Sequence, residues 1–438
     1  MRPISPMQFK ERSFWADTAP TPGRATSRPL PESADVAVVG AGFTGLCAAR
    51  VLAKAGARVA VLEAETAGWG ASSRNGGMVL TGLKLGLHTL SEKYGRETAH
   101  QLYAASLEAL DTVEQIVKEE EIACDFSRSG HLEVACKPSH FRGFLQSAEL
   151  VSREFNLRVR AVSKAELREE IGSEIYYGGL VDETSGCVNP ARYVAGLAVA
   201  AEKAGAGLYE RTRVERIQPD TRQGVKGHQV WTSRGSLWAR EVFLATGGYT
   251  GRATPALRKK IIPIGSYIIV TEVLPEDLAR EVSPRNRMIY DSKNFLYYFR
   301  LTPDRRMLFG GRAAFFPESA DTIRRSAEIL HRGMVQVYPM LRDVKVEYAW
   351  GGTLDFCFDM MPHAGQLEGL YYALGYAGHG VAMATYLGTR MGRIICGERE
   401  EIPFARIPFP GAPLGLYNGT PWFLPFAGGW YKFLDWVS

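Results

Sequence analysis

The sequence predicts an α/β protein in which a parallel sheet covered by helices is joined to a second, α+β domain built on an antiparallel sheet. The first observation is an apolar run at 36–39 that leads, through a glycine-rich turn and a small-residue helix, to a second expected strand at 58–62, apolar after Arg58. The second is the change of pattern at 261–348, where β-branched and aromatic runs alternate with turns around one helical stretch. We expect the two domains to be interleaved in the sequence.

The turn after the first strand has the spacing Gly40-Ala41-Gly42-Phe43-Thr44-Gly45. Gly40 permits a tight turn, Gly42 lets a pyrophosphate approach the backbone, and Gly45 lets the helix lie close to the sheet. The free amides and the positive dipole end of that helix then face the phosphates. Glu63 ends the second strand, 18 residues after Gly45, where a carboxylate can accept hydrogen bonds from both hydroxyls of an adenosine ribose. These features together predict a Rossmann-like, dinucleotide-binding unit.

Three further glycine-dense segments indicate where a planar ligand would lie. The loop 68–78 is too polar for a core, which favours backbone lying against a ligand, and its Arg74 is suited to neutralising pyrophosphate charge. The strand 241–248 ends in two glycines at the sheet edge. The segment 375–381 leads through Gly-His-Gly into a helix and presents another positive helix end. One cofactor contacted by several distant loops is the simplest account.

Composition and charge limit the other function classes. The 438 residues carry a net charge of +5 and no long basic run, so nucleic acid is not expected as a partner. The six cysteines show no C-x-x-C spacing, which disfavours a disulfide framework or a zinc site and favours free thiols in a reducing compartment. No metal is expected. No secretory signal pattern and no run of 18 apolar residues occurs, so we expect a cytoplasmic protein.

Shifts in pattern along the chain suggest its division into domains. We expect an irregular N-terminal arm at 1–34, anchored on the body by Phe14 and Trp15. The aromatic C-terminal tail is expected to pack on the protein's own body. The expected segments are 35–90, 176–260 and 346–400 for the dinucleotide-binding domain, 91–175 and 261–345 for the substrate domain, and 401–438 for the tail.

Several motifs beyond the first unit resemble those of one enzyme superfamily. They are Ser73-Arg74-Asn75-Gly76-Gly77, Cys187-Val188-Asn189-Pro190, Ala245-Thr246-Gly247-Gly248, Leu308-Phe309-Gly310-Gly311-Arg312, Trp350-Gly351-Gly352-Thr353 and Gly375-Tyr376-Ala377-Gly378-His379-Gly380. With the glycine turn and its acid, they make the chain similar to the D-amino-acid oxidase-like superfamily of FAD-dependent oxidoreductases. Within it, the chain resembles the gamma-glutamylputrescine oxidase-like amine oxidase branch. The likeness covers nearly the whole chain.

The resemblance implies FAD as the cofactor and names the residues expected to bind it. These are Gly40, Ala41, Gly42, Phe43, Thr44, Gly45, Glu63, Ala64, Ser72, Ser73, Arg74, Asn75, Gly76, Gly77, Met78, Val214, Ala245, Thr246, Gly247, Gly378, His379, Gly380 and Val381. Relatives carry a flavin-linking cysteine or a carboxylate-binding arginine near the position of Trp350. Because this chain has a tryptophan there, the resemblance implies that FAD is bound non-covalently. It also implies that no arginine at this position binds the carboxylate of an α-amino acid.

The expected reaction is oxidation of an amine carbon–nitrogen bond. A neutral amine, polyamine-derived or secondary, would pass its α-hydrogen to flavin N5 as a hydride, and the imine would hydrolyse to an aldehyde. Oxygen or another electron acceptor would reoxidise the flavin. The residues expected at the catalytic and substrate site are His379, Trp350, Tyr267, Tyr298, Arg312 and Tyr376. Of these, His379 is expected to supply a charged or donating group beside the flavin.

Three alternatives remain open from the sequence. The first is an FAD-dependent amino-acid or N-methyl-amino-acid dehydrogenase or oxidase, with Arg312 binding the carboxylate. The second is a nicotinamide-dependent dehydrogenase. The third is a membrane-surface or docking flavoprotein, because the tail is aromatic at 422–426 and 430–436. Peripheral membrane contact through the tail is possible but not favoured, since the segment is short and carries little charge.

Overall fold

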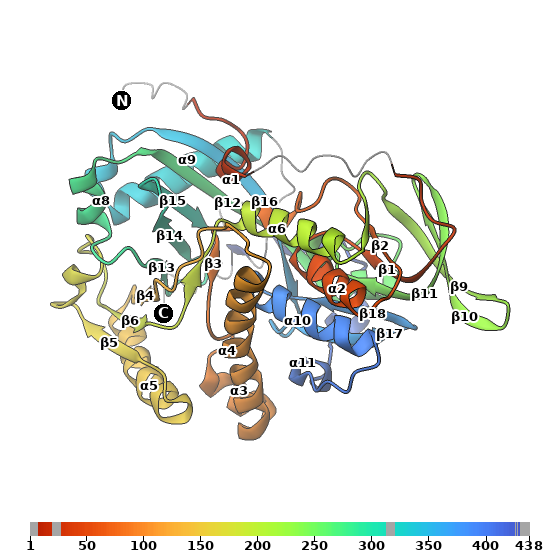
Figure 1. Ribbon diagram of the computed structural model, residues 1–438. Coiled ribbons are helices and arrows are strands. Elements are labelled where there is room, and N and C mark those ends of the chain that lie inside the picture. Colours follow the sequence, from red (N-terminus) through yellow and green to blue (C-terminus); the bar gives the residue numbers. More distant parts are fainter. Residues whose placement is uncertain (1–7, 20–27, 312–319, 425, 427, 430–438) are drawn as a thin grey trace.

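A computed structural model describes residues 8–19, 28–311, 320–424, 426 and 428–429. Their strands form two eight-stranded sheets and one two-stranded pair. Figure 1 shows the mainly parallel sheet on the right and the mainly antiparallel one on the left, with helices covering both. The expected α/β fold with a second, sheet-based domain is confirmed.

The first sheet carries the glycine-rich turn. Its strands are β1 (Ser33–Val39), β2 (Val59–Leu62), β8 (Gly207–Tyr209), β9 (Val214–Arg222), β10 (Val225–Thr232), β11 (Gly235–Leu244), β17 (His363–Leu367) and β18 (Leu370–Leu374). Their order is β17-β18-β11-β1-β2-β8, with β10 and β9 added beside β11 as an antiparallel hairpin. β1 pairs in parallel with both β2 and β11. A strand in the middle of such a sheet is covered on both faces, which explains its unbroken apolar run.

Helices cover this sheet, some in contact with its strands and others in a second layer on those helices. They are α2 (Phe43–Lys54), α3 (Leu87–Tyr94), α4 (Arg96–Glu119), α6 (Pro190–Lys203) and α10 (Gly380–Ile395). α10 lies directly on α2, and a Cβ added to Gly388 would lie 2.3 Å from the carbonyl oxygen of Thr44. Because only glycine allows this approach, the middle of α10 can pack directly on the first turn of α2, which follows the glycine turn.

The second sheet is antiparallel except for one pair. Its order is β16-β12-β15-β14-β13-β4-β6-β5, and β13 pairs with β4 in parallel. One face packs on α9 (Ala320–Val337) and α8 (Glu276–Val282), while α5 (Pro138–Phe155) lies beside β5 and β6. The strands are β4 (His131–Val134), β5 (Val159–Ser163), β6 (Gly178–Asp182), β12 (Ile261–Val273), β13 (Met288–Asp291), β14 (Tyr297–Leu301), β15 (Arg306–Gly311) and β16 (Val346–Cys357).

Three segments lie elsewhere than the sequence suggested. β16 and β6 fall in ranges expected for the dinucleotide-binding domain, yet both are strands of the second sheet. β16 pairs with β12 from Ile261–Cys357 to Thr271–Val346, a long-range register that no local pattern reveals. The helix α4, expected in the substrate domain, instead contributes Leu102 and Leu110 to the core beneath the first sheet. The apolar stripe of α4 predicts a buried face but not the partner that buries it.

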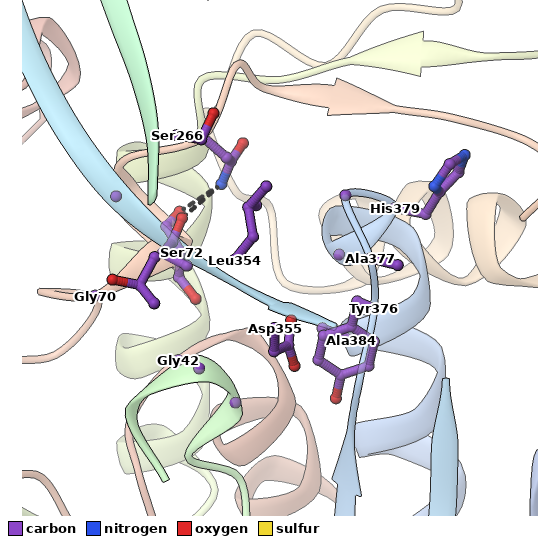
Figure 2. Close-up of a pocket in the computed structure, with 18 of the residues that line it drawn as sticks. Gly42, Gly70, Ser72, Ser266, Leu354, Asp355, Tyr376, Ala377, His379 and Ala384 are labelled. Carbon is purple, nitrogen blue, oxygen red and sulfur yellow. Dashed lines mark hydrogen bonds between the residues drawn. The ribbon is translucent and has the colours of Figure 1, made fainter. Parts of the chain in front are cut away.

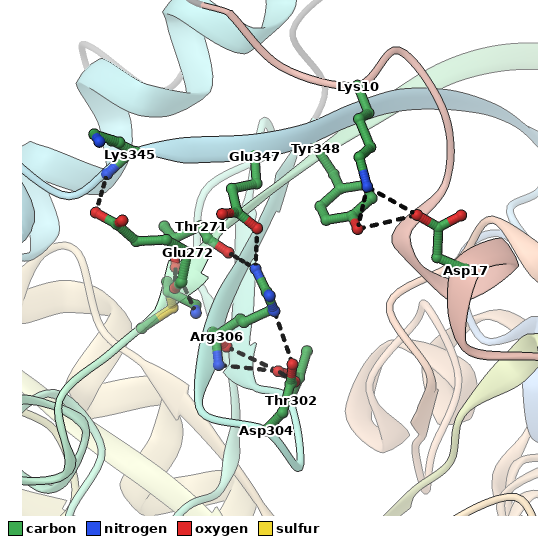
Figure 3. A network of polar contacts seen from close by, with 11 residues as sticks. Lys10, Asp17, Thr271, Glu272, Thr302, Asp304, Arg306, Lys345, Glu347 and Tyr348 are labelled. Atoms are coloured by element: carbon green, nitrogen blue, oxygen red, sulfur yellow. Dashed lines mark hydrogen bonds and ion pairs between the residues drawn. The ribbon is translucent and has the colours of Figure 1, made fainter.

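The N-terminal arm is anchored on the body as expected. α1 (Phe14–Thr18) buries Phe14 and Trp15 against β16 and its neighbours. Figure 3 shows the polar side of this contact, where Lys10 Nζ donates to the Tyr348 hydroxyl (3.1 Å) and that hydroxyl donates to Asp17 (3.0 Å). The same figure shows Arg306 of β15 joined to Glu347 of β16. The arm therefore closes over the edge of the second sheet.

The described part of the tail packs on the body in places. Tyr417 and Leu424 are buried, and the Tyr417 hydroxyl donates to the carbonyl oxygen of Ile261 (2.6 Å). Trp422 and Phe426, in contrast, are 58% and 75% exposed. The aromatic residues at 430–436 lie outside the described residues. No helix among the described residues is long and apolar enough to cross a membrane.

Short elements complete the described chain. They are β3 (Met78–Val79), β7 (Gly186–Cys187), α7 (Pro255–Arg258), α11 (Pro403–Arg406), η2 (Ala71–Ser73), η3 (Leu167–Glu169), η4 (Gly247–Tyr249), η5 (Pro339–Leu341) and η6 (Pro413–Gly415). η2 and η4 matter most for function, because both contribute residues to the cavity described next.

Candidate active site

A cavity of about 1360 Å³ lies between the two sheets. One wall is the carboxyl edge of the parallel sheet, with the turns after β1, β2, β11 and β18, and the other is a face of the second sheet. Figure 2 shows residues from distant parts of the chain around one space, among them Gly42, Ser72, Asp355 and His379. Ligand pockets usually measure about 300–1,000 Å³, so this cavity has room for a large cofactor and a second molecule.

The glycine turn forms one end of the cavity. Gly40 has φ +104°, a backbone conformation that favours glycine, and a Cβ on Gly42 would lie 2.8 Å from Ser72 Oγ. The Glu63 carboxylate accepts hydrogen bonds from the amides of Ala41 and Glu65, both at 2.8 Å, and burial raises its pKa. Each carboxylate oxygen keeps capacity to accept a further hydrogen bond. The arrangement is that expected for an adenosine ribose and a pyrophosphate.

The loop after β2 is braced internally and by α1. The Asn75 amide donates to the carbonyls of Ala71 (3.0 Å) and Ser72 (3.1 Å), and Asn75 Oδ1 accepts from the Gly77 amide (2.7 Å). The Trp15 indole donates to the Asn75 carbonyl (2.9 Å). The loop therefore presents a fixed stretch of backbone to the cavity.

Arg74 and Trp350 have roles in this loop that the sequence did not indicate. The Arg74 guanidinium donates to the carbonyls of Trp69 (2.9 Å) and Gly351 (3.2 Å) and lies over the Trp69 ring. The Trp350 indole is 1% exposed and donates to the Arg74 carbonyl (2.9 Å). The expectation that Trp350 lines the substrate site is wrong, because its side chain packs behind the loop with Trp15 and Tyr348.

The start of α10 lines the cavity at a distance in sequence from the glycine turn. His379 precedes the helix and lines the cavity, and its Nδ1 has no hydrogen-bond partner among the described residues. Burial, reinforced by the charge of Lys84, lowers the pKa of His379 to about 3. The imidazole is therefore neutral at physiological pH, so of the two expected roles a donor fits and a cation does not. The first amides of α10 add a positive helix end.

The second sheet supplies a polar wall with a few apolar patches. Tyr298 lines the cavity as expected, and its hydroxyl shares a hydrogen bond with Ser266 Oγ (3.1 Å). Tyr267, the other tyrosine expected there, is buried on the opposite face of β12 in the core under α9, so that expectation is wrong. Tyr376 also lines the cavity, and its hydroxyl shares a hydrogen bond with Thr44 Oγ1 (2.7 Å). Arg312 lies outside the described residues.

The remaining expected cofactor residues divide into those at the surface of the cavity and those behind it. All of them line the cavity except Gly45, Ser73 and Gly77. Gly45 instead packs α2 on the sheet, as its place in the turn predicts. The Ser73 carbonyl accepts from Ser13 Oγ (3.1 Å), and the Gly77 carbonyl accepts from the Val188 amide (2.9 Å). These three residues support the cradle, meaning the cofactor-lining loops around the glycine turn, without facing the cavity.

Sequence reasoning missed most of the substrate wall. The missed residues are Lys84, Glu133, His140, Phe144, Ser147, Leu180, Ser266, Tyr290, Asp291, Ser292, Lys293, Asn294 and Leu296. One signal was available in β4, where polar His131 and Glu133 alternate with Leu132 and Val134. Such alternation predicts a strand with one core face and one polar face.

A family model described as FAD dependent oxidoreductase matches residues 35–393. The chain belongs to this family. The oxidoreductase is 34% identical to gamma-glutamylputrescine oxidoreductase of Escherichia coli (strain K12) over 92% of each chain. It is 32% identical to a probable oxidoreductase, OrdL, of Haemophilus influenzae over 85% of each. The crystal structure of glycine oxidase from Geobacillus kaustophilus has a TM-score of 0.72 at 22% identity, covers 87% of this chain and 100% of its own, and shows the fold.

The oxidoreductase is an FAD-dependent enzyme, and its cradle fits that cofactor. A Cβ on Gly40 would lie 2.7 Å from the Ala245 carbonyl oxygen, so glycine lets the turn stay tight at the cavity. The first turn of α2 offers amides beyond that of Phe43, which donates to Ser72 Oγ, and Glu63 is placed for a ribose. Family membership confirms the expected resemblance and the cofactor, and it rules out the nicotinamide-dependent alternative. The enzyme acts on amines or amino acids.

Proposed function

We propose that this oxidoreductase oxidises a carbon–nitrogen bond of a polyamine-derived or secondary amine. The observation that carries the proposal is one continuous cavity that joins the FAD cradle to a wall bearing carboxylates, hydroxyls and apolar side chains. The likeness to gamma-glutamylputrescine oxidoreductase over 92% of each chain supports an amine substrate. An amine with an alkyl chain has the chemistry that such a wall would recognise.

The residues around the glycine turn would hold the cofactor. Glu63 would accept hydrogen bonds from the adenosine ribose, and the amides of Thr44 and Gly45, which follow the Phe43 amide bonded to Ser72 Oγ, would bind the pyrophosphate. The braced loop 72–76 would lie along the flavin, and the first amides of α10 would face its pyrimidine edge. When bound, FAD supplies the acceptor, at N5, for a hydride from the carbon next to the substrate nitrogen. We propose that it is bound non-covalently, which accords with the absence of cysteine from the described cavity lining.

The chain's own residues would orient the amine and stabilise charge. Neutral His379 and the amides of α10 can donate towards negative charge that develops beside them. Tyr298, held by Ser266, would help to keep the substrate carbon over the ring. The product imine then hydrolyses to an aldehyde in water. Oxygen or another acceptor would complete the cycle.

Anaerobic bleaching of the purified holoenzyme tests this function. We expect a yellow protein whose flavin absorbance falls on addition of an amine, and we would compare polyamines, acylated polyamines, N-methyl amino acids and plain amino acids. Faster bleaching by the amines supports the proposal. Bleaching by amino acids alone would favour the amino-acid oxidase alternative, and the absence of bleaching by every compound would refute both. Flotation with liposomes, with and without the tail, would test the membrane-surface alternative.

A further inference from the structure

Glu133 stands on the wall of the cavity that faces the substrate. It lies in the middle of β4, between Tyr290 of β13 and Leu180 of β6, and all three residues line the cavity. Its neighbours in sequence, Leu132 and Val134, point to the other face and are fully buried in the core. The register of β4 therefore directs the Glu133 carboxylate into the cavity.

Most other acids in the cavity lining already have partners. Exposed Glu215 has none among the described residues, but it belongs to β9 of the first sheet and not to the second sheet, which carries Glu133. Glu63 accepts two backbone amides, Asp291 lies 3.2 Å from Lys293 Nζ, and Asp355 accepts the Gly375 amide at 2.7 Å. Glu133 differs from them, since it has no hydrogen bond or ion pair within the part of the chain that the structure describes. Lys84 is close enough to lower the pKa of Glu133, but burial outweighs it and raises that pKa to about 7.

An unpaired, half-buried carboxylate is unfavourable unless a cation comes to it. The surroundings specify the cation further, because Leu180, paired with Glu133 across the strands, adds apolar surface beside it, and Phe144 lines the same cavity. A methylene chain that ends in an ammonium group matches both features. An amine substrate of the proposed function would bring such a group.

We propose that Glu133 binds a protonated nitrogen of the substrate other than the nitrogen whose carbon is oxidised. The reacting nitrogen must use its lone pair as the hydride leaves, and a partner carboxylate would hold that nitrogen as ammonium instead. The residue thus acts in positioning and specificity, and it selects substrates with a second positive charge. This inference rests on the proposed amine oxidation.

The test compares 1,4-diaminobutane with butylamine, which share their carbon chain and differ in the second nitrogen. Anaerobic flavin reduction of the holoenzyme is measured for the wild type, Glu133→Gln and Glu133→Asp. We expect the ratio of kcat/KM for the diamine over the monoamine to fall about tenfold or more in Glu133→Gln, mainly through KM, and to recover in part in Glu133→Asp. Glu149→Gln, on an exposed side chain of α5, should leave the ratio unchanged.

The outcomes separate this inference from the function on which it depends. An equal ratio in the wild type and Glu133→Gln, with FAD content and melting temperature unchanged, would overturn the role of Glu133. So would a wild type that neither binds nor oxidises the diamine while another amine bleaches its flavin. If Glu133→Gln slows both probes equally, the carboxylate serves the reacting nitrogen, which also overturns the inference. No bleaching by any amine would instead refute the proposed function.

Discussion

Replacing Gly45 by alanine would separate α2 from the turn that it must support. A Cβ at this position would lie 1.9 Å from the Gly40 carbonyl oxygen and 3.2 Å from Val38 Cγ1. Real Cβ atoms essentially never approach closer than 3.0 Å, so the start of the helix would have to retreat by more than 1 Å. The atom in the way is backbone in a tight turn, which cannot rotate aside.

The displacement of α2 in Gly45→Ala should lower the free energy of unfolding by an amount that can be bounded. Overpacking a close-packed site typically costs about 1–3 kcal/mol, while alanine in place of glycine within a helix returns up to about 1 kcal/mol. The same displacement moves the first amides of α2 away from the pyrophosphate, where their charge-assisted hydrogen bonds depend on short distances. We therefore expect a lower melting temperature of the apoprotein and FAD binding weakened about tenfold or more.

Fluorescence titration of the apoprotein with FAD and thermal melting measure the two effects. Gly143→Ala is the matched control for stability, because it also lies within a helix and an added Cβ meets no atom within 4 Å. That variant should melt at or above the temperature of the wild type. A Gly45→Ala protein that binds FAD with wild-type affinity and melts with the wild type would refute the role assigned to close helix–sheet packing.

Three further predictions concern the site. Replacing His379 by alanine removes a neutral donor beside the flavin wall, so amine-driven flavin reduction should slow about tenfold or more, and an unchanged rate would remove His379 from the site. Trp350→Phe keeps an aromatic ring, although a smaller one, but loses the hydrogen bond to the Arg74 carbonyl, so FAD should dissociate more readily with little change in substrate selectivity. An unchanged dissociation constant would contradict this. Finally, burial, opposed by Lys84 and reinforced by Asp291, raises the pKa of Glu133 to about 7, so its carboxylate gains a proton as the pH falls below that value. The preference for the diamine over butylamine should therefore decline below about pH 7 in the wild type but not in Glu133→Gln. A pH-independent preference would argue against this.

The sequence predicted the parts of the site that are local and missed those that depend on strand register. The turn at Gly40, the acid at Glu63 and the start of α10 are each set by a few consecutive residues, and all lie at the cavity. On β12 the prediction chose Tyr267, whereas its neighbour Ser266 lines the cavity. Successive side chains of a strand point to opposite faces of the sheet. An error of one position therefore assigns a core residue to the site, or a site residue to the core. Aromatic composition alone cannot decide between the two faces.

Some of the contacts that hold the loop 72–76 come from residues outside the family match. That match begins at residue 35, yet the arm before it donates from Ser13 Oγ to the Ser73 carbonyl and from the Trp15 indole to the Asn75 carbonyl. Trp350 supports the same loop from β16. A loop rich in glycine gains little rigidity from its own sequence, so its fixed shape must come from such donors behind it. The arm accordingly supports the loop from behind, and none of the arm's described residues lines the cavity.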